Sequence, residues 1–94
     1  MKLKEQLDKL GLNIEFPEVI LNYDLFLSDG YTSQSTETIN GKEYTVLTGT
    51  NSNNQKIECI LNPYKQRVDE FLIENDGTRT ILSSIDSEGN IPLY

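Results

Sequence analysis

The chain has 94 residues, and its eight Lys and Arg against fifteen Asp and Glu give a formal net charge of −7. This length fits a single domain, residues 1–94, with one modest core and no room for a deep cavity. A surface of this sign repels phosphate backbones and anionic headgroups, so we expect neither direct nucleic-acid binding nor membrane binding. It would attract a basic protein partner, although the same charge also serves solubility alone.

The residue types that are missing from the sequence limit the catalytic reactions and the metal sites that we can expect. The sequence contains no His, the side chain best suited to proton transfer near neutral pH and a common zinc ligand. Cys59 is the single cysteine, which excludes an internal disulfide and a cysteine-based zinc site. The acidic turn that starts at Asp86 does not match a calcium-binding EF-hand loop, because its sixth residue is Ile91 and not Gly. We therefore expect that the protein is not an enzyme and that it binds no metal and no cofactor.

Targeting signals are also missing from the sequence. Residues 1–6 lack the apolar region of a signal peptide, and no apolar run approaches the ~18 residues of a membrane-spanning helix. A soluble, cytoplasmic protein is the expectation.

Residues 2–10 have the pattern of a short amphipathic helix. Leu3, Leu7 and Leu10 recur at helical spacing, and Gly11 follows as a typical helix stop. A helix this short is marginal alone, so we expect it to pack on the rest of the domain.

Residues 19–27 fit two templates. Alternate positions are apolar throughout, which favours a strand. Asn22 and Asp24 are weak helix formers and agree with that interpretation. A helix remains the alternative, because Pro17 would suit its first turn.

The second half of the chain predicts an antiparallel meander. Asn40-Gly41 is a strong hairpin signal between extended runs at 33–39 and 42–48. Residues 56–62 alternate, with Ile57, Cys59 and Leu61 on one face. Further turn signals recur at regular spacing, as in an antiparallel sheet. The predicted fold class is α+β: a short N-terminal helix packed on a twisted antiparallel β-meander of five to six strands, with a small half-open barrel as a variant.

The candidate binding residues come from the stretch between Leu10 and Gly41, which has no Lys or Arg. They are its acidic residues and one tyrosine expected in a turn: Glu15, Glu18, Asp24, Asp29, Glu37 and Tyr31. Tyr64 and Tyr94 are also expected at turn or terminal positions, where tyrosine often marks an interface.

These observations predict a small acidic protein-binding module, such as an inhibitor or immunity-type protein that covers a basic surface of its partner. It would act as a monomer or a weak homo-oligomer. The alternative function is a structural or assembly subunit that oligomerises through an edge strand at residues 33–39.

Overall fold

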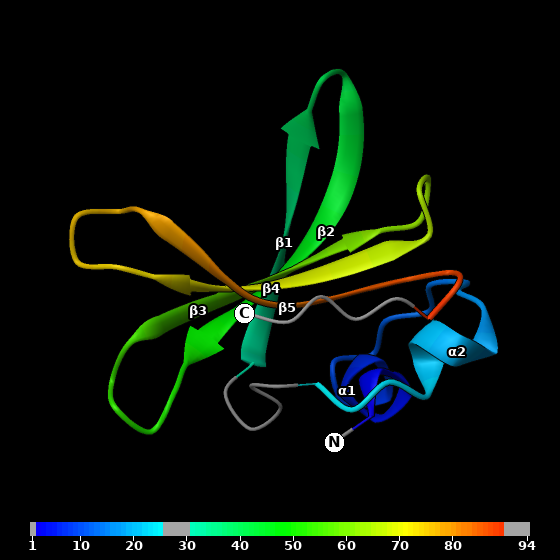
Figure 1. Cartoon of the computed structure of the whole chain (residues 1–94), viewed down its shortest axis with the longest axis horizontal. Coiled ribbons are helices and arrows are strands. Elements are labelled where there is room, and N and C mark those ends of the chain that lie inside the picture. Colours follow the sequence, from blue (N-terminus) through cyan, green and yellow to red (C-terminus); the bar gives the residue numbers. More distant parts are fainter. Residues whose placement is uncertain (1, 26–30, 90–94) are drawn as a thin grey trace.

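The computed structural model describes residues 2–25 and 31–89, which form two short helices and one five-stranded sheet (Figure 1). The elements are α1 (Leu3–Lys9), α2 (Glu18–Leu21), β1 (Tyr31–Ile39), β2 (Lys42–Thr50), β3 (Lys56–Asn62), β4 (Arg67–Ile73) and β5 (Arg79–Asp86). Each strand is antiparallel to the next, and their order in the sheet is their order in the chain. The predicted helix and antiparallel meander are confirmed, and the sheet is not closed into a barrel.

The hairpin between β1 and β2 forms where the sequence predicts it. Ile39 pairs with Lys42, so the loop contains only Asn40 and Gly41. Both loop residues have positive φ, 52° and 79°, as a two-residue hairpin turn of this kind requires.

Replacing Gly41 with alanine is expected to lower the free energy of unfolding by about 1–2 kcal/mol, because an L-residue resists positive φ. A Cβ at this position would meet nothing within 4 Å, so backbone strain is the whole effect. Asn40→Gly, which keeps the turn unstrained, is the control and should change stability little. Urea denaturation compares the two variants, and equal stabilities would contradict the role of positive φ at Gly41.

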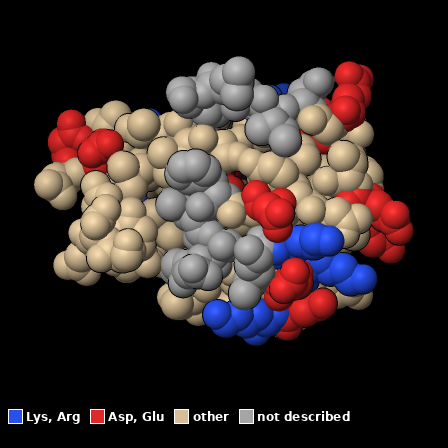
Figure 2. Space-filling view, turned by 60° about the horizontal axis from the view of Figure 1, so that its bottom comes forward, with Lys and Arg blue, Asp and Glu red and all other residues tan. Residues whose placement is uncertain are grey.

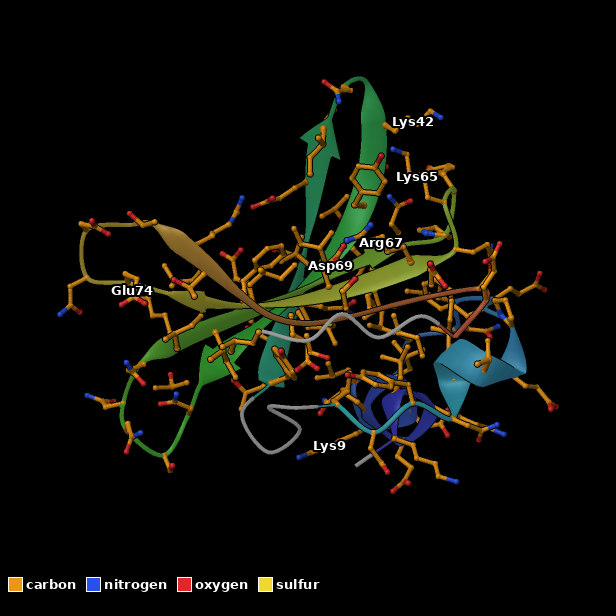
Figure 3. The ribbon with its side chains drawn as sticks, viewed as in Figure 1. Lys9, Lys42, Lys65, Arg67, Asp69 and Glu74 are labelled. Carbon is orange, nitrogen blue, oxygen red and sulfur yellow. The ribbon has the colours of Figure 1, made fainter. Side chains whose placement is uncertain are left out.

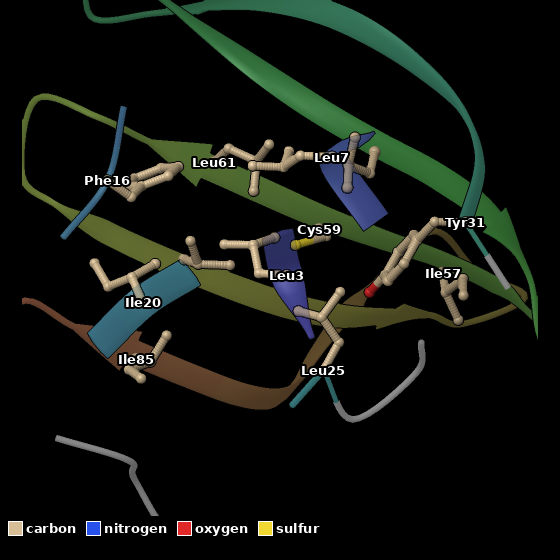
Figure 4. Packing of buried hydrophobic residues seen from close by; sticks show 12 residues of the cluster. Leu3, Leu7, Phe16, Ile20, Leu25, Tyr31, Ile57, Cys59, Leu61 and Ile85 are labelled. Atoms are coloured by element: carbon tan, nitrogen blue, oxygen red, sulfur yellow. The ribbon is translucent and has the colours of Figure 1, made fainter. Parts of the chain in front are cut away.

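The core lies between one face of the sheet and the two helices. Ile57, Cys59 and Leu61 share this face and are each at most 1% exposed, as predicted. Leu3 of α1 and Ile20 of α2 pack against them (Figure 4). The leucine stripe of α1 is therefore part of the core.

The strand predicted at residues 19–27 is wrong for its first part, where one turn of helix, α2, forms instead. Pro17 precedes this turn, and its carbonyl oxygen accepts hydrogen bonds from the N–H groups of Ile20 and Leu21. A strand would have buried Val19, yet Val19 is 42% exposed and Ile20 is fully buried. The chain after α2 pairs with the start of α1 and not with the sheet, since the N–H of Leu3 donates to the Tyr23 carbonyl oxygen at 2.9 Å.

The face of the sheet opposite the helices is concave. Arg79 of β5 has a guanidinium nitrogen 2.9 Å from a carboxylate oxygen of Glu58 and 3.9 Å from one of Glu37. Glu37 lies on β1 and Arg79 on β5, the two opposite edges of the sheet. In a flat sheet these edges would be roughly 19 Å apart. Two side chains bridge the edges only because the open sheet curls strongly.

Candidate functional site

The acidic residues predicted to bind a partner do not form one surface. Glu15 and Glu18 are exposed beside and within α2. Asp24 is exposed but lies opposite Lys2 in an isolated bridge at the start of α1. Glu37 lies on the concave face of the sheet, 3.9 Å from Arg79. Asp29 lies outside the described residues.

Tyr31 is not a surface residue, so its predicted place in a turn is wrong. It is the first residue of β1 and is only 1% exposed. Its hydroxyl donates a hydrogen bond of 2.9 Å to a carboxylate oxygen of Glu70. A side chain buried in this way cannot contact a partner of the folded domain.

Two distant segments meet at α2. A Cβ added to Gly89 would lie 3.2 Å from Cγ2 of Val19, so the turn after β5 packs against this helix. The turn is held by Asp86, whose carboxylate accepts the N–H of Glu88 at 2.9 Å. Exposed Glu88 thereby joins Glu15 and Glu18 on the same end of the molecule. We call Glu15, Glu18, Val19 and Glu88 the acidic end.

The acidic end has a distinct surface chemistry. Neither of the segments that form it, residues 10–41 and 80–94, contains a Lys or Arg. Figure 2 shows acidic side chains at the right-hand end, which carries α2 and the end of β5 in Figure 1. Acidic side chains also appear at the left-hand end of this view and among the basic side chains grouped at its lower right. The acidic end therefore differs from the rest of the surface because its own segments contain no Lys or Arg, and not because carboxylates gather there alone.

A buried polar cluster was missed by the sequence analysis. Glu70 is 1% exposed and sits between Cys59 on β3 and Ser83 on β5, its partners in the neighbouring strands. The hydroxyl of Ser83 is hydrogen-bonded to that of Tyr23. Glu70 and Ser83 are buried and Tyr23 is half-buried, so the cluster belongs to the core.

The cluster changes the acidity of two of its members. Burial is the main reason why the pKa of the Tyr31 phenol is raised well above its ordinary value, and the charges of Cys59 and Glu70 add to this effect. Burial likewise raises the pKa of the Cys59 thiol, helped by the charges of Glu70 and Asp69 and opposed by a hydrogen bond with Tyr31. Both groups are therefore neutral near pH 7, and Cys59 is not an activated nucleophile.

A hollow of about 380 Å³ lies on the sheet, lined by residues of β2, β3 and β4. Its one carboxylate, Glu58, is ion-paired with Arg79 at 2.9 Å. Carboxylate chemistry of the glycosidase type needs two such groups flanking a bond, and this hollow does not supply them.

The described part of the chain contains no group of three His, Cys, Asp or Glu side chains placed to hold a metal ion. Within the same residues, neither helix has the length and apolar character needed to cross a membrane. Comparison of the chain with protein-family models, curated proteins and solved structures finds no match.

Proposed function

We propose that this protein is a small protein-binding module whose acidic end docks on a basic surface of its partner, as an inhibitor or immunity-type protein would. One observation supports the proposal above others: the contact between Gly89 and exposed Val19 brings the turn that carries Glu88 to α2, which contains Glu18 and follows Glu15 in the chain.

The arrangement has the chemistry of a binding surface. Val19 is 42% exposed, and only Tyr64 among the other large apolar side chains of the described residues is as open to solvent. An apolar centre with charged groups around it resembles the core and rim of protein interfaces. The carboxylates would steer a basic partner into contact, while burial of Val19 would supply contact energy.

The alternative, an assembly subunit, has support from β1. This strand is at an edge of the sheet, and no strand in the described residues pairs with its outer side. Its exposed residues are Ser and Thr apart from Gln34, and half-buried Glu37 adds a carboxylate. Polar and charged residues on an edge discourage strand addition, so this function ranks second.

Charge reversal at the acidic end tests the proposal. The unmodified protein is expected to capture a basic partner from an extract of its native cells and to release it as the salt concentration rises. The triple variant Glu15→Lys, Glu18→Lys and Glu88→Lys is expected to capture no such partner. The matched control reverses three exposed carboxylates elsewhere, Glu5, Asp8 and Glu43.

The control variant should keep the partner, because it has the same net charge but an intact acidic end. Loss of the partner from both variants would show that only total charge matters. If the triple variant still captured the partner, the acidic end would not be the docking surface. Salt-resistant oligomers of the unmodified protein would favour the assembly function instead.

A further inference from the structure

A second surface of opposite chemistry lies where the β1–β2 and β3–β4 hairpins approach each other. The ammonium nitrogen of Lys42 is 5.2 Å from the centroid of the Tyr64 ring. The rings of Tyr44 and Tyr64 meet edge to face, with centroids 5.6 Å apart and an interplanar angle of 73°. Lys65 follows Tyr64 in the turn, and Figure 3 shows both lysines projecting from this end of the sheet. We call Lys42, Tyr44, Tyr64 and Lys65 the aromatic–basic patch.

The turn that carries half of this patch is held in place by side chains. The carboxamide oxygen of Asn62 accepts hydrogen bonds from the N–H groups of Tyr64 at 3.1 Å and Lys65 at 3.0 Å. Gln66 closes the turn by donating to the Pro63 carbonyl oxygen at 2.7 Å. Tyr64 is nevertheless 56% exposed. An ordered yet exposed side chain loses little freedom on binding, which favours its use as a contact.

The positive charge of the patch is not neutralised within the described residues. Arg67 is bound by Asp69 at 2.9 Å, and Arg79 by Glu58 at 2.9 Å. Neither Lys42 nor Lys65 has an ion-pair partner in the part of the chain that the structure describes.

Two carboxylates lie near the patch. Exposed Glu43 lies between Lys42 and Tyr44 in β2, and strand alternation places it on the opposite face from both. Glu37 pairs with Tyr44 across the β1–β2 ladder, and its oxygen is 3.9 Å from Arg79. Glu37 and Glu58 share the single guanidinium of Arg79, which leaves one negative charge against the two positive charges of Lys42 and Lys65.

We propose that the aromatic–basic patch binds an acidic segment of a protein partner. Carboxylates of the segment would pair with Lys42 and Lys65, and an apolar side chain between them would pack on Tyr64. This surface is separate from the acidic end in both its elements and its sign, so the proposal does not depend on the proposed function.

The overall charge decides between two kinds of anionic partner. With −7 on the chain, a long nucleic acid would be repelled by most of the surface that it approached. A short acidic peptide contacts the patch alone, and salt screens the other charges beyond about 8 Å at physiological ionic strength. An acidic peptide is therefore the occupant that the charges favour.

Titration of the ¹⁵N-labelled protein with acetylated hexaglutamate, followed by NMR, tests this proposal. Amide shifts are expected in residues 40–45 and 62–66, with little change elsewhere. The variant Lys42→Glu with Lys65→Glu should weaken binding by at least ~10-fold, because two attractive pairs become repulsive. The matched control Lys4→Glu with Lys56→Glu makes the same change of charge at exposed positions outside the patch and should bind within about twofold of the unmodified protein.

A parallel titration with hexathymidylate supplies the second arm. Tighter binding of this oligonucleotide at the same residues would overturn the choice of a protein partner. Dispersed shifts with hexaglutamate, or equal weakening in the patch variant and the control, would overturn the patch itself. A peptide with two central leucines, acetylated Glu-Glu-Leu-Leu-Glu-Glu, tests the aromatic contribution. Tyr64→Ala, with the spectrum of a folded protein, should bind this peptide more weakly than the unmodified protein does.

Discussion

Replacing Leu3 with alanine is expected to lower the free energy of unfolding by about 2–5 kcal/mol, a large share of the stability of a domain this size. Leu3 is fully buried in the cluster that joins α1 to the sheet. Its truncation removes apolar contact and leaves a cavity. The seven residues of α1 are too few to form a stable helix without that packing, so the loss is expected to detach the helix as well.

Urea denaturation measures this effect through the midpoint of unfolding. Lys4→Ala is the control, since Lys4 is the exposed neighbour of Leu3 on the same helix. It should change the free energy of unfolding by no more than about 0.5 kcal/mol. If Leu3→Ala were as harmless as the control, α1 would not be an integral part of the core.

The meander was predictable because its signals are local. Two adjacent residues, Asn40 and Gly41, determine the hairpin through their tolerance of positive φ. The alternation of Ile57, Cys59 and Leu61 assigns one face of β3 to the core without reference to any other strand.

Residues 19–27 show where local patterns stop being sufficient. The alternation there is as regular as that of β3, but a single helical turn after Pro17 buries Ile20 and leaves Val19 exposed. What decides between the templates is a tertiary contact, the pairing of the following chain with the start of α1. Such contacts routinely override a short sequence pattern.

The same limit applies to the candidate surfaces. The sequence shows that Glu15 and Glu18 lie in a basic-free segment, but only the contact between α2 and Gly89 brings Glu88 to them. Glu70 was missed because both faces of β4 carry apolar residues, so alternation does not say which face is buried. A bulge between Glu70 and Phe71 further shifts the register against β5.

Raising the pH is expected to destabilise the domain. The loss should begin at about pH 9, near the ordinary thiol pKa of 9.0, and become steeper above about pH 10, near the ordinary phenol pKa of 10.0. Both pKa values are raised in the folded state, mainly by burial. The unfolded chain therefore releases its protons first, and folding opposes their release. Each group should lower the free energy of unfolding by up to about 1.4 kcal/mol per pH unit above its unfolded pKa. This stability is fully present at lower pH.

Tyr31→Phe separates the hydrogen bond from the titration. At neutral pH the variant is expected to lose about 1.5–3 kcal/mol, because Glu70 is deprived of a buried donor. Above pH 10 its stability should fall less steeply than that of the unmodified protein, since the phenol with the raised pKa is gone. Tyr64→Phe, at an exposed position, should change neither the free energy of unfolding at neutral pH nor its dependence on pH. Urea denaturation between pH 7 and about 11 measures both quantities, and parallel curves for Tyr31→Phe and the unmodified protein would mean that the buried phenol does not couple folding to pH.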